Sequence, residues 1–275
     1  MTQPTQIQAQ LEIEGCTAEL YLNDVPVMRL RPGDMKVQLL AVEQLVIPGK
    51  NRLEVLVEPG PTPNTAREAS RVLEKGALGE APRASAKLVR FTITEEPSIA
   101  DPEILMEATW QWPIGPDDPV LFPQSAVAER DLGDGRGPWR WQSLPPHVLD
   151  RGLHDEVMRF LDEMEAAFLQ GDLDLLWDLS RQQNEDVQRC YPGLTETFLR
   201  GDMARVVDFY RRSPDPVFPR DPARTDLRLA AGGRMLHVID RDWTPTYKLR
   251  DPDDGTAVGV PMLLGRVDGK LRIVR

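Results

Sequence analysis

The sequence has few cysteines and few histidines. Its 275 residues include two cysteines, Cys16 and Cys190, and three histidines. A disulfide-stabilised scaffold or a zinc ribbon requires several cysteines at short spacings, and these two lie in opposite halves of the chain. The sequence therefore excludes both kinds of fold.

Long hydrophobic runs and a basic leader are also missing. The sequence contains no stretch near the roughly 18 consecutive apolar residues that a membrane-spanning helix needs. Its first residues, 1–6, have neither the basic region nor the apolar region of a secretory signal. We therefore expect a cytoplasmic protein that does not bind membranes.

Basic residues are fewer than acidic ones. The chain has 33 Lys and Arg residues against 44 Asp and Glu residues, which gives a formal net charge of -11. The electrostatic field of a negatively charged protein repels the phosphates of nucleic acids and of anionic lipids. We therefore expect no nucleic-acid partner. The acidity has two explanations. It keeps the protein soluble, or it attracts a basic protein partner, since complementary potentials accelerate encounter.

Common nucleotide, hydrolase and metal motifs are absent. The chain has no Gly-x-Gly-x-x-Gly, no Walker Gly-Lys-Ser/Thr, no Gly-x-Ser-x-Gly and no His-Glu-x-x-His. Residues 131–135 and 251–255 are rich in Asp and Gly, but they lack the spacing and the trailing Glu of an EF-hand loop. We interpret both as turns. The sequence thus predicts no cofactor and no metal site.

Composition and length indicate two globular domains. Hydrophobic residues make up 41% of the chain and charged residues 28%, which is ordinary globular usage. A chain of this length fits two domains better than one. Most prolines precede His147, which favours a loop-rich β domain followed by a more helical one. We predict domains at 1–146 and 147–275, with Pro145 and Pro146 as the linker.

The first domain alternates apolar and polar residues with the period of half-buried strands. Strands are predicted at 7–13, at 20–27 on both sides of an Asn-Asp turn, and at 52–58, 87–93, 104–112, 120–127 and 139–141. Turn residues recur at short intervals between them, which is typical of an all-β antiparallel sandwich. The pattern breaks at 60–85, where we place a surface insertion with one short helix at 67–75.

The second domain begins with a helical period. Five apolar residues fall on one stripe of a helix: Val157, Phe160, Leu161, Met164 and Phe168. Gly171 ends this helix and Asp172 caps the next. A third helix is predicted at 195–212, with Val206 among its inner residues.

Alternation returns from residue 226 onward. Turns at 232–233, 252–255 and 267–269 separate short strands, as in an antiparallel meander. Helices followed by such strands predict an α+β domain, in which the helices pack on one face of a bent antiparallel sheet.

Two segments carry family resemblances. In the first domain, Leu20–Asp24 and the Pro-Gly-Lys-Asn turn that ends at Asn51 resemble the jelly-roll β-sandwiches of the galactose-binding-like class. In the second domain, Glu165–Asp174 and the terminal Gly265–Arg275 resemble the NTF2-like class. The second resemblance implies a cone-shaped α+β fold. That class includes enzymes and many binding or accessory modules, so it does not fix the function.

Four of the six tryptophans form two Trp-x-Trp pairs, Trp110 with Trp112 and Trp139 with Trp141. On a strand, residues two apart share a face, so each pair would present two neighbouring rings. Three interpretations stay open. The rings fill a core or the junction between domains, they contact another protein, or they stack on a sugar. Sugar binding requires exposed, coplanar rings.

One set of side chains could catalyse proton transfer. His237 would act as the base, Asp226 would orient it, and Tyr247 would donate to a developing oxyanion inside the cone. The alternative is a core or rim histidine satisfied by one hydrogen bond. His147, in the linker, and His154, at a helix start, are expected to be solvated.

These observations support three hypotheses. The first is a soluble, non-catalytic binding or accessory protein, such as an inhibitor or an immunity-type partner of another protein. The second is a small-molecule enzyme that uses the cone of the second domain. The third is a carbohydrate-binding module.

Overall fold

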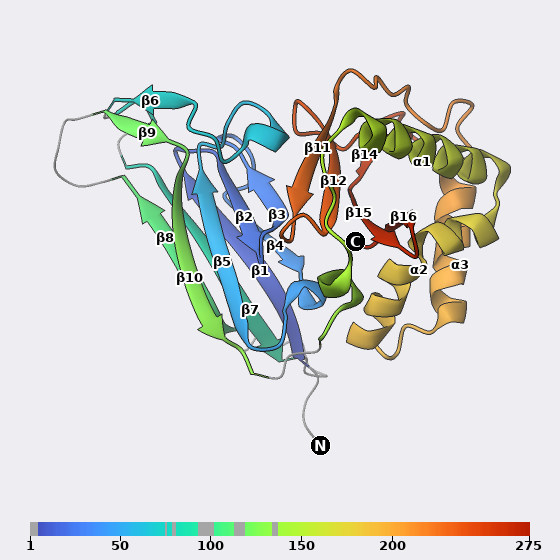
Figure 1. Ribbon diagram of the computed structural model, residues 1–275, viewed down its shortest axis with the longest axis horizontal. Helices are drawn as coiled ribbons and strands as arrows, with labels where there is room; N and C mark the ends of the chain where they lie inside the picture. The colour runs from blue at the N-terminus through green and yellow to red at the C-terminus, as the bar shows by residue number, and fades with distance from the viewer. Residues whose placement is uncertain (1–4, 75, 79–80, 93–101, 113–118, 134–136) are drawn as a thin grey trace. The chain divides into compact units, whose positions relative to one another are not determined.

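The structure is a computed structural model that describes residues 5–74, 76–78, 81–92, 102–112, 119–133 and 137–275 (Figure 1). It consists mostly of antiparallel sheets with three α-helices, which confirms the predicted combination of antiparallel strands and a few helices. The chain forms two compact units. Unit 1 comprises Met1–Pro61 and Thr65–Pro138, and unit 2 comprises Thr62–Asn64 and Trp139–Arg275.

These units divide before Trp139, ahead of the double proline that marks the predicted linker. The segment from Trp139 to Pro146, predicted as the end of the β domain, belongs to unit 2. The predicted domain bounds, 1–146 and 147–275, stay a prediction.

Unit 1 contains two four-stranded antiparallel sheets and a small third one. The strands are β1 (Thr5–Glu14), β2 (Ala18–Leu22), β3 (Val25–Leu30), β4 (Val37–Ala41), β5 (Lys50–Val57), β6 (Arg71–Leu73), β7 (Arg83–Thr92), β8 (Glu103–Gln111), β9 (Val120–Phe122) and β10 (Gln124–Asp131). The sheet orders are β4-β1-β7-β8, β10-β5-β2-β3 and β6-β9. The two large sheets pack face to face, as in a β-sandwich, and their facing side chains, such as Leu11, Leu20 and Val55, are fully buried.

Three local predictions for the first domain are wrong. The helix predicted at 67–75 is replaced by strand β6, which pairs with β9. The predicted strand at 139–141 is a 3-10 helix, η3 (Arg140–Ser143), whose start is fixed when the Trp139 backbone N–H donates to Gln142 Oε1 at 2.8 Å. The strand predicted at 120–127 is split at Pro123, because proline has no N–H for the ladder.

Two asparagines join the turns of the first unit. Asn51 is completely buried, and its Nδ2 donates to the carbonyls of Ile47 and Gly49 at 2.8 and 3.0 Å. Its Oδ1 accepts from Ile47 N and from Asn23 Nδ2, at 2.9 and 2.8 Å. Asn23 has a φ of 53° in the tight turn between β2 and β3, a conformation that asparagine tolerates better than most residues. The residues that carry the first resemblance therefore bond each other.

Unit 2 contains three helices and six strands. The helices are α1 (Arg151–Gln170), α2 (Leu173–Cys190) and α3 (Glu196–Tyr210), and the strands are β11 (Thr225–Ala230), β12 (Met235–Asp240), β13 (Tyr247–Arg250), β14 (Ala257–Val260), β15 (Met262–Val267) and β16 (Lys270–Ile273). Strands β11-β12-β15-β16 form one antiparallel sheet, and β13 pairs with β14. None of the described helices has the length and apolarity that a membrane crossing requires.

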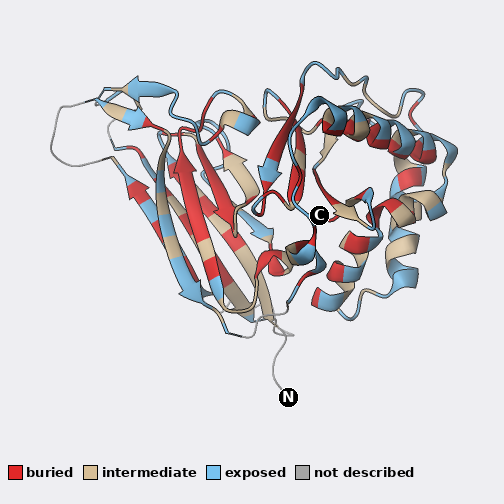
Figure 2. Ribbon diagram, in the orientation of Figure 1, coloured by how far each residue is buried: buried red, intermediate tan, exposed pale blue. Residues whose placement is uncertain are grey.

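The predicted helix boundaries are confirmed by their caps. Gly171 ends α1 with a φ of 72°, and the Asp172 side chain accepts from Leu175 N at 2.9 Å to begin α2. The apolar stripe of α1 is buried along its whole length (Figure 2). On α3, however, Val206 is exposed and Val207 is buried, so the inner face is narrower than predicted.

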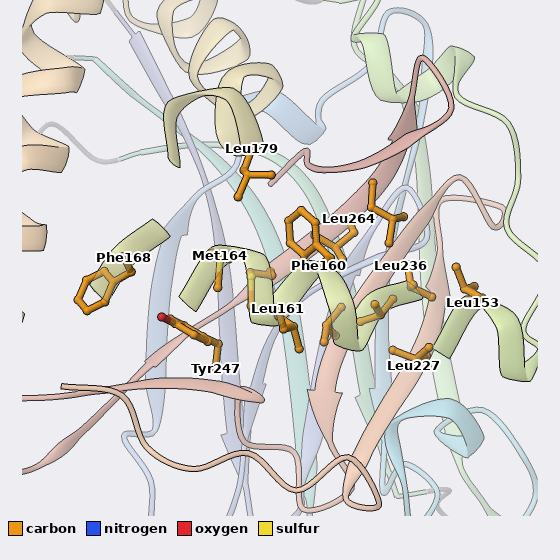
Figure 3. Close-up of a cluster of buried hydrophobic side chains, with 14 of the residues drawn as sticks. Leu153, Phe160, Leu161, Met164, Phe168, Leu179, Leu227, Leu236, Tyr247 and Leu264 are labelled. Carbon is orange, nitrogen blue, oxygen red and sulfur yellow. The ribbon is translucent and has the colours of Figure 1, made fainter. Parts of the chain in front are cut away.

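The helices cover one face of the four-stranded sheet. Sixteen buried hydrophobic residues fill the space between them, including Phe160, Leu161 and Met164 of α1 with Leu236 and Leu264 of the sheet (Figure 3). This cluster is the hydrophobic core of unit 2.

We expect the Asn51→Ala substitution to lower the free energy of unfolding by about 2–4 kcal/mol, because it leaves several buried backbone and amide groups unpaired. Urea denaturation measures this change. The control is Asn64→Ala, since Asn64 is exposed and should change stability by less than about 0.5 kcal/mol. Equal effects of the two substitutions would contradict a structural role for the asparagine pair.

Candidate functional site

The three residues predicted for proton transfer do not share one face. His237 pairs with Arg228 in the sheet register, and Asp226 pairs with Ile239, which places His237 and Asp226 on the same face. Tyr247 instead belongs to the hydrophobic cluster on the helix-covered face. The Asp226 carboxylate accepts from Asn64 N at 3.0 Å. The predicted trio is therefore not assembled.

Burial also makes His237 a poor base. Desolvation, together with the charge of Arg228, lowers the pKa of His237 to about 3. A general base works best with a pKa near the operating pH. Burial also raises the pKa of the Tyr247 phenol, which keeps it protonated. Both side chains are therefore neutral near pH 7.

The first tryptophan pair lies at the end of β8. Trp110 is buried, with 6% of its surface exposed, and Trp112 is partly buried. Their ring centroids are 6.5 Å apart with an interplanar angle of 79°, and both rings also contact Phe122. This edge-to-face arrangement is typical of aromatic packing. It does not provide the exposed, coplanar rings that stacking on a sugar requires.

The second pair lies at the start of unit 2. Trp139 and Trp141 are 1% and 5% exposed, and the 3-10 geometry of η3 removes the shared strand face that was predicted. The Arg189 guanidinium lies over the Trp139 ring, 4.9 Å from its centroid. These positions agree with rings that fill a core.

Unit 1 carries buried carboxylates that are already bonded. Glu19 accepts from the Tyr21 hydroxyl at 2.6 Å, and Glu54 accepts two bonds from Arg67 at 2.7 and 2.9 Å. The Arg67 guanidinium also lies over the Tyr21 ring, 4.3 Å from its centroid. Paired in this way, these acids stabilise the sheet, and they leave little capacity to bind a ligand.

Open space in unit 2 lies at its surface, in what we call the charged cleft. It consists of two adjoining cavities of about 480 and 320 Å³ that share Asp178, Lys270 and Arg272. Helix α1, helix α2 and the turn between β15 and β16 form its walls. The other charged lining residues are Glu156, Arg159, Glu163, Arg140, Arg181, Glu185 and Asp268. Most of these side chains are exposed, so the cleft is a charged surface feature.

Ion pairs fasten the walls of the charged cleft to one another. Arg266 of β15 donates to both oxygens of Glu156 on α1, at 2.9 and 2.6 Å. These bonds lower the pKa of Glu156 and raise that of Arg266. Arg272 of β16 donates to Asp178 of α2 at 2.8 Å. The hairpin β15–β16 is thus tied to both helices.

Two cations of the cleft stand apart from these pairs. Among the described residues, no ion pair engages Arg159 or Lys270. Both side chains are exposed. Cations without a fixed partner are the groups that a binding partner can engage without breaking an existing bond.

Part of the cleft has a buried polar wall. Gln182 lines the smaller cavity although it is only 4% exposed, and Asp186, one helical turn further along α2, is 3% exposed. Within the described part of the chain, Gln182 Oε1 and Asp186 Oδ2 have no hydrogen-bond donor. Burial raises the pKa of Asp186 to about 6, and hydrogen bonding from Gln182 and the charge of Arg189 oppose this rise.

The sequence patterns did not predict this cleft. Its residues come from four separate segments, and exposed charges on helices and turns have no periodic signal. The only local sign is the Gly265–Arg275 segment, which was singled out for its resemblance and not for its charges. The described residues contain no cluster of His, Cys, Asp and Glu suited to a metal ion.

Comparisons with protein-family models, with curated proteins and with solved structures find no match for this chain.

The raised pKa of Asp186 predicts that Asp186→Asn stabilises the protein at pH 8 by about 2 kcal/mol. The folded pKa, about 6, lies above the ordinary value of 3.8, so burying the charged form costs stability above pH 6. That cost disappears as the pH falls toward 4, and the two proteins should then have similar stability. Urea denaturation at pH 8 and pH 4 tests this, with Asp208→Asn, the same change at an exposed position of α3, as control. An unchanged or lower stability at pH 8 would refute it.

The lowered pKa of His237 makes the opposite prediction. The folded state resists protonating this ring, so the stability that it contributes is complete above the ordinary pKa of 6.5 and decreases as the pH falls toward 3. In His237→Gln this loss should be smaller by up to about 1.4 kcal/mol per pH unit. NMR of the ring nitrogens gives a direct check, because His237 should stay neutral at pH 5. A charged ring at that pH would contradict its burial.

Proposed function

We propose that this chain is a non-catalytic binding or accessory protein, such as an inhibitor or an immunity-type partner, that acts by binding another protein. We further propose that unit 1 is a galactose-binding-like jelly roll and that unit 2 is an NTF2-like module. The observation that supports binding is the charged cleft. Unit 2 packs its interior with hydrophobic side chains and presents its open space at the surface.

The character of the cleft favours a macromolecular partner. Its walls carry exposed charged side chains above a few apolar ones, Phe160, Leu175, Leu179 and Leu271. Small-molecule sites are mostly apolar with a few placed polar groups, whereas protein interfaces combine an apolar centre, arginines and a charged rim. The cleft resembles the second type more closely.

The charge distribution favours a basic partner. Unit 1 has 13 basic and 21 acidic residues, and unit 2 has 20 basic and 23 acidic residues. Both units are acidic, so the long-range field attracts a positively charged protein and increases its association rate. The unpaired Arg159 and Lys270 would then select among such partners by engaging local acidic groups.

The alternative functions lack such support. The enzyme hypothesis depends on His237, Asp226 and Tyr247, which lie on two faces of the sheet. The carbohydrate hypothesis depends on Trp110, Trp112, Trp139 and Trp141, of which three are buried.

Affinity capture with charge-reversed variants tests the proposed function. The cleft variant carries Arg159→Glu and Lys270→Glu, and the control carries Lys36→Glu and Arg205→Glu, which make the same change of net charge at exposed positions outside the cleft. We expect the wild type and the control to retain a stoichiometric protein from a cell lysate. We expect the cleft variant to lose it by at least tenfold, because the engaged charges are reversed.

The captured protein is then purified and remixed with each variant, and the complex is measured by size-exclusion chromatography. Equal binding by the cleft and control variants would remove the cleft from the proposal. Failure of the wild type to retain any stoichiometric protein would contradict the proposed function itself.

A further inference from the structure

A third cavity of unit 2 lies at the start of α1. Its volume is about 310 Å³. We call it the His147 pocket, and its lining residues are Pro146, His147, Val148, Asp150, Gly152, Leu153, Glu156 and Arg266. It adjoins the charged cleft, because Glu156 lines both.

His147 is the unusual member of this pocket. Contrary to the expectation of a solvated linker residue, only 7% of it is exposed, and its backbone N–H donates to the Gly233 carbonyl at 2.8 Å. Among the described residues, none offers a hydrogen-bond partner to its Nε2 atom. Burial and the nearby charge of Arg266 lower the pKa of His147, so the ring is neutral and one ring nitrogen carries a lone pair. A buried polar atom without a partner points to an absent one.

The remaining polar groups of the pocket favour a hydrogen-bond donor as the occupant. Arg266 donates through its two terminal nitrogens to Glu156 and to the Gly269 carbonyl, so both of these nitrogens already have acceptors. Asp150 caps α1 through Oδ1, which accepts from Leu153 N at 2.7 Å. Because Glu156 and Arg266 neutralise each other, Asp150 leaves the lining with an excess of one negative charge. An anion would meet this carboxylate, and the arginine that lines the pocket already pairs with Glu156.

An exposed apolar segment adjoins the pocket. Val148, which lines the pocket, and its neighbour Leu149 are 75% and 43% exposed in the loop before α1. Exposed apolar side chains around a small polar pocket are typical of a site where one side chain of a protein partner inserts.

We propose that the His147 pocket receives a lysine or arginine side chain of the partner protein, which donates to His147 Nε2 and to the Asp150 carboxylate. Val148 and Leu149 then contact the apolar residues beside it. The inference rests on the proposed function and names the chemistry of the partner, whose basic character also matches the acidic charge of both units.

NMR of the full chain labelled with ¹⁵N histidine tests the proposal. The probes are the N-acetyl methylamides of lysine, arginine and glutamate, each titrated to tens of millimolar because a single side-chain contact binds weakly. The free protein should show His147 with an unprotonated Nε2. The lysine or arginine probe should shift the His147 ring signal, whereas His154 serves as an internal reference that does not move.

Matched variants locate the binding. Asp150→Asn retains the helix cap but removes the charge, and it should weaken binding of the lysine and arginine probes at least fivefold. Asp155→Asn, an exposed change one turn further along α1, should leave it unaltered. A protonated Nε2, a response to the glutamate probe alone, or no response at all would overturn the inference.

These outcomes are distinct from those of the capture experiment. Retained capture of a partner without a response to the basic probes leaves the proposed function standing and rejects only the pocket assignment. A response to the basic probes without any captured partner rejects the proposed function.

Discussion

The second unit depends on the contact between the apolar stripe of α1 and one face of the four-stranded sheet. Phe160, Leu161 and Met164 fill the space between the helix and the sheet. Burial of such side chains stabilises the unit by about 1.5–3 kcal/mol for each large residue. Because side chains fill the interior, the open space of the unit lies at its surface, where α1 and α2 meet the hairpin β15–β16.

Much of the architecture could be predicted from local patterns. The stripe from Val157 to Phe168, the stop at Gly171 and the cap at Asp172 follow from helix geometry and hydrogen bonding, and the structure shows all of them. The Asn23 turn was also predicted, although its bond to Asn51 was not. That bond joins two turns that are far apart in the sequence. A periodic pattern within each segment does not predict a contact between them.

The wrong predictions also have physical causes. At 139–141, alternation of Trp and Arg imitates a strand, but the backbone contact with Gln142 and the prolines that follow favour a 3-10 turn. At 67–75, helix-forming residues were outweighed by the pairing of β6 with β9. The candidate site was missed because its residues converge from four segments, of which the first and the last lie more than one hundred positions apart. The strand that contains His237 was predicted correctly. The side of the sheet on which His237 lies depends on the neighbouring strands, and the pattern of one strand does not give it.

The Glu156–Arg266 pair also shapes the open space around it. Its two hydrogen bonds form a partition between the charged cleft and the pocket that holds His147, since Glu156 borders both spaces. The two recesses therefore have one wall in common, and any movement of the Glu156 carboxylate changes the dimensions of both at once.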